Sequence, residues 1–199
     1  MKTRTSVAIG MLFVTAILLL IGSAASADGG RDAPAVTDLT GVTAPVEPGT
    51  QIMFKANYVD PDDHAANYHS LHVDDTGQYI MEQLDPLDLN ASDGMLYFFN
   101  LTLPGGTHRY HFHFADGGNW TNTTDATIEV LHAPSAGDWV VTSPTAVWNA
   151  AIELRGNLTI NSGATLGLGN CSIKFNCGSD GQYGIRVKTG GALNIMNGT

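Results

Sequence analysis

Basic residues are scarce in this chain of 199 residues. Nine Lys and Arg stand against nineteen Asp and Glu, and the formal net charge is −10. A protein that binds nucleic acid needs a basic surface for the phosphates, so the composition argues against nucleic acid as a partner. Charged residues make up 14% of the chain, against a usual proportion of about 25%. The acidity is spread along the sequence, and we expect it to serve solubility.

Cysteine is nearly absent, with Cys171 and Cys177 as the two examples. In an oxidising compartment such a pair can join. Six residues of straight strand would hold the two Cα atoms about 20 Å apart, whereas a disulfide needs less than about 7 Å. A bond therefore requires a turn near residues 174–176, and two buried free thiols are the alternative. Zinc is disfavoured, because no further Cys or nearby His completes a ligand set.

Long apolar runs are missing apart from one at the N-terminus. There Lys2 and Arg4 precede an apolar stretch, Val7–Ile21, and a small-residue triplet, Ala25–Ala27. This order predicts a signal peptide over residues 1–27. The alternative is an uncleaved anchor, since about 17 apolar or small residues nearly span a bilayer. Both place the rest of the chain outside the cytoplasm, as a secreted or cell-surface protein that meets a membrane only through an uncleaved leader.

Helical periodicity is missing as well, and alternation of apolar and polar residues takes its place. Successive side chains of a strand point to opposite faces, so each alternating set can bury one face. The segment LPGGTH at Leu103–His108 separates two such runs and predicts a hairpin turn. The apolar sets are Ile52, Phe54, Ala56 and Tyr58; Leu71 and Val73; Met95, Tyr97, Phe99, Leu101 and Leu103; Tyr110, Phe112 and Phe114; and Ile128 and Val130.

The spacing of these runs predicts an all-β fold that begins with an antiparallel sandwich over residues 35–132. A flexible leader, residues 28–34, precedes the sandwich, and a linker, residues 133–138, follows it. The segments YVDPDD at Tyr58–Asp63 and DGMLYFFNLTLPGGTHRYHFHFADG at Asp93–Gly117, with the Met81 segment between them, resemble exported Ig-like domains of prokaryotic surface proteins. The same pattern is similar to starch-binding modules, although their Trp-bearing loop ahead of the Met is absent here. The resemblance implies an Ig-like sandwich in a surface protein, which we expect to be archaeal.

A repeat occupies the last third of the chain. The segment at Gly156–Ser172 recurs at Gly184–Thr199, and a recurrence at this spacing predicts a solenoid whose coils stack. We expect residues 139–199 to be the first coils of a right-handed parallel β-helix. Stacking is usually stable with three or more repeats, so we expect a truncated chain with an exposed end that aggregates. The matched pairs are Leu158 and Ile185, Ile160 and Val187, Leu166 and Leu193, Leu168 and Ile195, and Asn170 and Asn197.

Asn-x-Ser/Thr motifs are frequent, and each is a candidate acceptor for an N-linked glycan on a secreted protein. The alternative is that Asn and Thr are common at turns and strand edges. A glycoprotein would fit the predicted cell-surface location. The candidate acceptors are Asn90, Asn100, Asn119, Asn122, Asn157, Asn170 and Asn197.

Three carboxylates, Asp60, Asp62 and Asp63, follow a predicted strand. Oxygen ligands so close together suit calcium, and calcium is the one cofactor that the pattern admits. The alternative is an Asp-rich turn whose side chains bind local amides. His111 and His113 share a predicted strand face and could hold a transition metal, although a solvated polar face is favoured.

Trp120, beside Asn119 and Asn122, is the candidate aromatic contact for a carbohydrate. Arg186 and Lys188 alternate on a predicted solenoid strand and could face a groove, although a solvated face is favoured. No Ser-His-Asp arrangement can be inferred. We therefore expect a secreted or cell-surface structural or adhesion module without catalysis in this stretch, whose partner is a cell-envelope component, a glycan or a surface protein. The alternative is a carbohydrate-binding module of a polysaccharide lyase or hydrolase whose active coils lie beyond residue 199.

Overall fold

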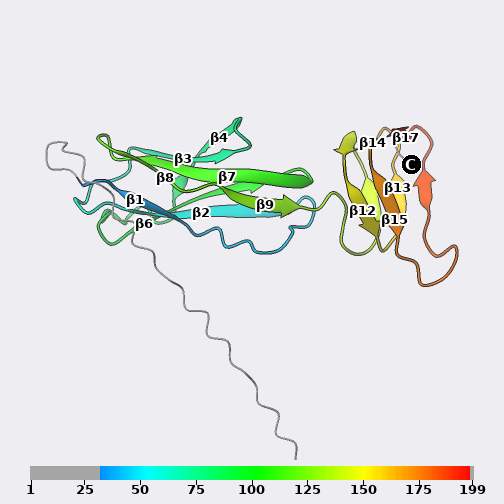
Figure 1. Cartoon of the computed structure of the whole chain (residues 1–199), viewed down its shortest axis with the longest axis horizontal. Coiled ribbons are helices and arrows are strands. Elements are labelled where there is room, and N and C mark those ends of the chain that lie inside the picture. The colour runs from blue at the N-terminus through cyan, green and yellow to red at the C-terminus, as the bar shows by residue number, and fades with distance from the viewer. Residues whose placement is uncertain (1–31, 198–199) are drawn as a thin grey trace, which may run out of the picture.

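A computed structural model describes residues 32–197, and its elements of regular structure are all β-strands (Figure 1). The predicted signal peptide and residues 28–31 of the predicted leader lie outside the described residues. The described chain forms an antiparallel sandwich followed by a parallel solenoid, and Figure 1 shows the two end to end along the long axis. In the part described, no helix is long and apolar enough to cross a membrane.

Two antiparallel sheets make the sandwich, as the alternation predicts. One has the strand order β1-β2-β6-β5; the other has the order β4-β3-β7-β8, with β9 also paired to β7. The strands of the first sheet are β1 (Ala35–Asp38), β2 (Gln51–Val59), β6 (Met95–Thr102) and β5 (Glu82–Gln83). Those of the second are β4 (Gly77–Ile80), β3 (Tyr68–Val73), β7 (Gly106–Ala115), β8 (Trp120–Asn122) and β9 (Ala126–Val130).

Aromatic rings join the two sheets across the core. Tyr58 of β2 stacks on Phe114 of β7 with ring centroids 5.5 Å apart, and Phe54 meets Tyr110 edge to face at 4.9 Å. These rings are buried, and such contacts add about 0.5–1.5 kcal/mol each to the burial of the rings. The hydroxyl of Tyr110 donates to Asp38 Oδ2 at 2.7 Å, which ties β1 to the opposite sheet. Burial, helped by this bond to Asp38, raises the pKa of Tyr110 to about 12.

The predicted hairpin at Leu103–His108 is wrong. The strands on either side of it, β6 and β7, belong to different sheets. Their apolar faces meet across the core, where Tyr97 and Phe114 contact edge to face at 5.1 Å. β6 pairs with β2 and β5, and β7 pairs with β3, β8 and β9, so each strand has its hydrogen-bonding partners within its own sheet. Local turn residues do not distinguish this arrangement from a hairpin, because the apolar face of each strand is buried in both. Gly105 allows the crossing, because a Cβ there would lie 2.6 Å from the Cα of His132.

The solenoid is built from parallel strands in three columns. The columns are β10-β13-β16, β11-β14-β17 and β12-β15. The first coil holds β10 (Trp139–Val141), β11 (Thr145–Trp148) and β12 (Ala151–Leu154). The second holds β13 (Leu158–Ile160), β14 (Thr165–Gly169) and β15 (Ser172–Phe175), and the described part of the third holds β16 (Ile185–Val187) and β17 (Ala192–Met196). Two complete coils and two strands of a third are therefore described.

The repeat predicts the register of the second and third coils correctly. Leu158 pairs with Ile185 and Leu166 with Leu193, as the alignment of the two segments requires. The expected solenoid, residues 139–199, includes the first coil, but the repeat does not predict how that coil pairs, because the step from Trp139 to its partner Leu158 is shorter than the step that the repeat shows. The longer step between the later coils is taken up by the loop between β15 and β16. Handedness of the helix stays a prediction.

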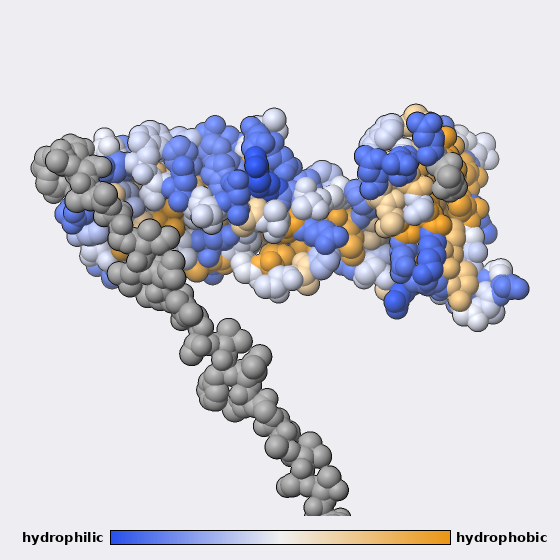
Figure 2. Space-filling model, viewed as in Figure 1, coloured by the Kyte–Doolittle hydropathy of each residue, from blue (hydrophilic) through white to orange (hydrophobic). Residues whose placement is uncertain are grey.

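Burial inside the solenoid falls toward the third coil. Leu158, Ile160 and Leu166 are fully buried, whereas Val187 is 44% exposed and Ile195 is 62% exposed. Each coil buries its inward face on the coils beside it, so β16 and β17 have neighbours on one side within the described residues. Figure 2 shows hydrophobic residues at the surface on the side of the solenoid away from the sandwich.

A ladder of asparagines forms one corner of the solenoid. Asn149, Asn170 and Asn197 have φ values of 55°, 51° and 52°, in the left-handed region that Asn tolerates better than most residues. Asn170 Nδ2 donates to Asn149 Oδ1 at 2.9 Å, so the side chains bond from coil to coil. Backbone bonds follow the same stacking, from Asn170 N to the Met196 carbonyl at 3.0 Å. Asn170 therefore belongs to a turn of the fold as well as to an Asn-x-Ser motif.

The segment between the two bodies is held on both sides. The last sandwich strand ends at Val130 and the first solenoid strand begins at Trp139, on either side of the predicted linker. Glu47 of the sandwich accepts hydrogen bonds from the backbone N–H and the hydroxyl of Ser135, and the hydroxyl bond is the main cause that lowers the pKa of Glu47. On the other side, Gly156 approaches the linker so closely that a Cβ would lie 2.0 Å from the Gly137 carbonyl oxygen. These contacts give the linker defined neighbours in both bodies.

Candidate functional site

The outer face of the second sandwich sheet carries a cluster of aromatic and imidazole rings. We call it the aromatic–histidine face, and its members are Tyr68, His72, His111, His113 and Trp120. They come from three neighbouring strands, β3, β7 and β8, whose register places His72 opposite His111. Because side chains two apart on a strand share a face, Tyr68, Ser70 and His72 lie on one face of β3, where Ser70 is fully buried, while Leu71 and Val73 enter the core. Figure 2 shows hydrophilic residues gathered on this side of the sandwich.

The rings contact one another in a continuous row. His72 stacks on His111 with centroids 4.9 Å apart and planes 15° apart, and it meets His113 at 5.6 Å. His113 contacts Trp120 edge to face at 4.7 Å. Tyr68 closes the row, at 5.4 Å from His113 and 5.3 Å from Trp120. Trp120 is thereby fixed by two neighbours although its side chain is 62% exposed.

Polar partners surround the row. The Ser70 hydroxyl lies 3.0 Å from His72 Nε2, and His111 Nδ1 lies 3.1 Å from Asp125 Oδ1. Gln78 on β4 donates to the Tyr68 hydroxyl. Burial is the main cause that lowers the pKa of His72, and the neighbouring His111 and His113 lower it further. Burial and His111 likewise lower the pKa of His113, so these two imidazoles favour the neutral form.

The face does not bring three metal-ligand atoms together. Within residues 32–197, one group of three His, Cys or carboxylate ligand atoms lies within 4.8 Å of one another, and it consists of Asp60, Asp62 and His64. The structure therefore places His111 and His113 in a row of rings rather than in a ready-made metal site. Sequence reasoning missed His72 and Tyr68, whose signal was the alternating set Tyr68, Ser70 and His72 on a strand distant in sequence.

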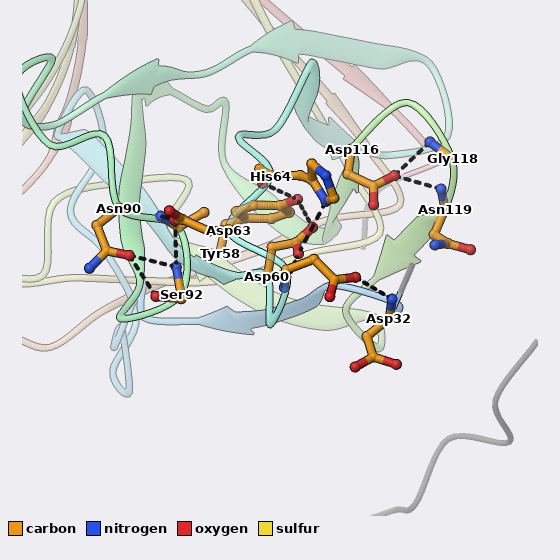
Figure 3. Close-up of polar contacts among 12 residues, drawn as sticks. Asp32, Tyr58, Asp60, Asp63, His64, Asn90, Ser92, Asp116, Gly118 and Asn119 are labelled. Carbon is orange, nitrogen blue, oxygen red and sulfur yellow. Dashed lines mark hydrogen bonds and ion pairs between the residues drawn. The ribbon is translucent and has the colours of Figure 1, made fainter. Parts of the chain in front are cut away.

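The predicted calcium residues lie in the turn after β2 (Figure 3). Asp60 is fully buried, and its Oδ1 accepts from Asp62 N at 2.8 Å while its Oδ2 accepts from the Tyr58 hydroxyl at 3.1 Å. Burial, followed by the charge of Asp60, raises the pKa of Tyr58. The same hydroxyl also lies 3.1 Å from the His64 carbonyl oxygen. These bonds fold the turn back over the end of the core.

Asp63 does not join the other two carboxylates. Its Oδ1 accepts from the backbone N–H groups of Ala91 and Ser92, at 2.7 and 3.2 Å, and so points to a neighbouring loop (Figure 3). His64 takes its place, with Nδ1 at 3.8 Å from Asp60 Oδ1. Two carboxylates and an imidazole suit a transition metal better than calcium, which prefers oxygen ligands. The bonds to local amides are those of the alternative interpretation, an Asp-rich turn.

A groove of about 1070 Å³ lies where the sandwich meets the first coil. It is lined by Glu129–Ala133 on the sandwich side and by Trp148, Glu153 and Arg155, among others, on the solenoid side. Trp148 is half-exposed, and its ring lies against Gly169, where a Cβ would be 1.9 Å from the ring. Bonds from Lys174 and Asn176 lower the pKa of Glu153. The groove thus has an aromatic ring, a carboxylate and a guanidinium in its lining, and sequence reasoning did not predict that these three line one groove.

The structure divides the candidate glycan acceptors. Asn90, Asn100 and Asn122 are exposed. Asn119 has its Nδ2 buried. Asn157 donates from Nδ2 to Asp138 Oδ1 at 3.2 Å and accepts from Gly184 N at 3.1 Å, which links two coils. The amides of Asn157 and Asn170 therefore bond to neighbouring coils, although Asn170 is exposed, and the exposed Asn197 lies at the same corner as Asn170.

The two cysteines are free thiols in the structure. Cys171 is buried, with Sγ 3.3 Å from the Val147 carbonyl oxygen, and Cys177 is exposed beyond β15. The intervening residues form a strand rather than the turn that a disulfide would need. Arg186 is exposed on β16, and Lys188 is exposed immediately after it.

Comparison with known proteins is uninformative about identity. No known protein family matches the chain, and no curated protein sequence matches it. Among solved structures, a point mutant of the SrpA adhesin from Streptococcus sanguinis matches with 15% identity and a TM-score of 0.35. The match covers 49% of this chain and 57% of the adhesin chain. A similarity this low does not bear on what the chain binds or does.

Proposed function

We propose that the chain is an exported cell-surface module, in which the solenoid and the sandwich together hold an interaction face away from the envelope. The supporting observation is the end-to-end placement of the two bodies, with a linker bonded to the sandwich through Glu47 and packed on the solenoid at Gly156 (Figure 1). Contacts on both sides limit bending at the linker, which suits a spacer that presents one surface to a partner. The partner would be a cell-envelope component, a surface protein or a glycan.

Protease shaving of intact cells that produce the chain tests this proposal. Trypsin cuts after Lys and Arg, and Arg155, Lys174, Arg186 and Lys188 are exposed on the solenoid. We expect solenoid peptides in the supernatant of intact cells, or the chain itself in the medium if the leader is cleaved and nothing retains it. Recovery of the chain only after cell lysis, while a known surface protein is shaved, would contradict the proposal.

Carbohydrate binding is the second candidate, and the groove between the sandwich and the first coil favours it. Trp148 offers a ring face there, and Glu153 and Arg155 offer charged hydrogen-bonding groups. Ligand sites occur preferentially where domains meet. A glycan array probed with the chain tests this function, with Trp148→Ala as the matched variant. Binding that is lost in the variant would support it; no binding at millimolar sugar would contradict it.

A further inference from the structure

We propose that Asn122 carries an N-linked glycan and that the first sugar of this glycan packs on Trp120 and His113 of the same chain. The proposal rests on the proposed export, because glycan transfer to Asn takes place on exported chains. The ligand of the exposed end of the aromatic–histidine face would then be a glycan that is covalently attached to the same chain.

Asn122 and Trp120 point to the same side of β8. They are two residues apart on the strand, and both are exposed while Thr121 between them is half-buried. Residues at this spacing are about 6.6–6.8 Å apart along a strand. The register places Asn122 directly opposite His113, whose ring contacts Trp120 at 4.7 Å. A sugar on Asn122 therefore begins beside His113 and has the indole ring within reach.

In the motif Asn122-Thr123-Thr124, the two residues that a glycan transferase recognises are exposed. Asn122 is the last residue of the edge strand β8, Thr123 and Thr124 follow it, and both Asn122 and Thr124 are exposed. Thr123 between them is held to β7, since its N–H donates to the Phe112 carbonyl at 3.0 Å and its Oγ1 accepts from Phe112 N at 3.0 Å. The middle residue of the motif thus anchors the segment, while the two residues that a transferase recognises face outward.

The neighbouring acceptor motif, at Asn119, differs from Asn122 in the burial of its amide nitrogen. Asn119 lies three residues earlier, yet its Nδ2 is buried, so a glycan bonded to that nitrogen would have to displace the loop. Asp116 Oδ1 holds this loop by accepting from Gly118 N and Asn119 N, both at 2.6 Å (Figure 3). We therefore expect occupancy at Asn122 and not at Asn119.

The ring surface suits a sugar. The apolar C–H face of a pyranose packs on an aromatic face, and Trp offers the largest such surface. Tyr68 and His113 hold the indole in place, so little freedom is lost when the sugar packs. The attachment raises the local concentration of the sugar to the millimolar range, as for short linkers. The attached sugar can therefore occupy the Trp120 surface even if its affinity is weak, and a free saccharide at lower concentration does not displace it.

The transfer step uses a lipid-linked oligosaccharide as the donor. Asn122 Nδ2 attacks the anomeric carbon, and an N–C bond forms as the bond from that carbon to the lipid phosphate oxygen breaks. The lipid phosphate leaves with the electron pair, and Nδ2 loses one proton to a base of the transferase. No oxidation or reduction is involved.

Mass spectrometry of the full chain, exported from an N-glycosylating host, tests occupancy. Trypsin releases residues 110–155 as one peptide that contains both Asn119 and Asn122. We expect a glycan mass on this peptide in the native chain and in Asn119→Gln, and its loss in Asn122→Gln. An exported, glycosylated reporter protein serves as the control for the host. An unmodified peptide on an exported chain would overturn the inference and leave the proposed function standing, whereas failure of export would count against both.

Thermal unfolding tests the packing. Enzymatic removal of the glycan should lower the unfolding midpoint by about 2–4 °C in the native chain, and by less than half as much in Trp120→Ala. Equal shifts in the two proteins would overturn the packing.

A titration tests whether the face binds a free saccharide. The unglycosylated chain is titrated with free N-acetylglucosamine disaccharide while tryptophan fluorescence is followed. No saturation below about 10 mM is expected for so small a contact area. Saturation that is lost in Trp120→Ala would overturn the inference, because the face would then bind an external glycan.

Discussion

His72 stacks on His111 across the β3–β7 pair, with ring centroids 4.9 Å apart and ring planes 15° apart. His113 lies beside them, so three imidazoles share one face of the sheet. Asp125 pairs with His111 at 3.1 Å and with Arg109 at 3.5 Å, and Arg109 also pairs with Asp75. A row of stacked imidazoles is compatible with neutral rings, and each added proton opposes the next.

Stability should therefore fall as the pH drops below 6.5. The folded pKa values of His72 and His113 lie below the ordinary value of 6.5, so the unfolded chain binds more protons below that pH. The stability is fully present above pH 6.5 and is lost as the pH falls toward the folded values. Urea unfolding at pH 7.5 and 5.5 should show a lower midpoint at pH 5.5, with a smaller difference in His72→Gln. An equal difference in the two proteins would show that the imidazole row does not cause the effect.

Close packing between the linker and the second coil predicts a sharp difference between two glycines. In Gly156→Ala the new Cβ would lie 2.0 Å from the Gly137 carbonyl oxygen and 2.6 Å from Asp138 N. Backbone must move, and we expect a loss of about 3 kcal/mol or more in the free energy of unfolding. Gly184→Ala is the matched control, because nothing lies within 4 Å of its Cβ position, and it should change stability by less than about 1 kcal/mol. Chemical denaturation of both variants measures the free energy of unfolding. Similar losses in the two variants would contradict the close approach of Gly156 to Gly137.

The asparagine ladder predicts an order of stability at residue 170. Asn170→Gly keeps the left-handed backbone but loses the bond to Asn149, whereas Asn170→Ala loses the bond and strains the backbone at φ 51°. A left-handed Ala costs about 1–2 kcal/mol, so the native chain should be the most stable and the Ala variant the least. Unfolding midpoints measure the order. An Ala variant as stable as the Gly variant would mean that this corner is not left-handed.

Exposed stacking surface on the third coil predicts self-association of the 199-residue chain. Val187 and Ile195 are inward-facing positions of their columns, yet they are about half-exposed, and β16 and β17 present unpaired edges within the described residues. Such edges pair with other chains. Light scattering should show a mass that rises with concentration, and Val187→Lys with Ile195→Lys should suppress the rise. A mass that stays that of a monomer at high concentration would refute this prediction.

Alternation and the sequence repeat predicted the features of the fold that follow from regular spacing along the chain. Alternation identified the buried residues of β2 and β7, because period two follows from the geometry of any strand. The repeat predicted the pairing of Leu158 with Ile185, since like residues stack when one coil lies on the next. The pairing of the first coil was not predicted, although its residues were placed in the solenoid. Trp139 and Thr145 differ in kind from their partners Leu158 and Leu166, and both lie closer to those partners in sequence than the repeat leads one to expect.

Contacts between distant segments were beyond the reach of these patterns. The alternation of β6 and β7 is the same whether the strands pair or face each other, so the predicted hairpin was wrong. His72 approaches His111 only through the pairing of β3 with β7, and no local signal records it. Asp63 was grouped with Asp60 because they are neighbours in sequence, but the amides of Ala91 and Ser92 draw its carboxylate away.

Small-angle X-ray scattering tests the central claim, that sandwich and solenoid stand end to end as a spacer. The measurement uses the chain without residues 1–31, extrapolated to zero concentration so that self-association does not contribute. A compact domain of this length has a radius of gyration of about 15–16 Å. We predict a clearly larger value and a two-lobed distance distribution; a value of about 15–16 Å with a single symmetric peak would contradict the account.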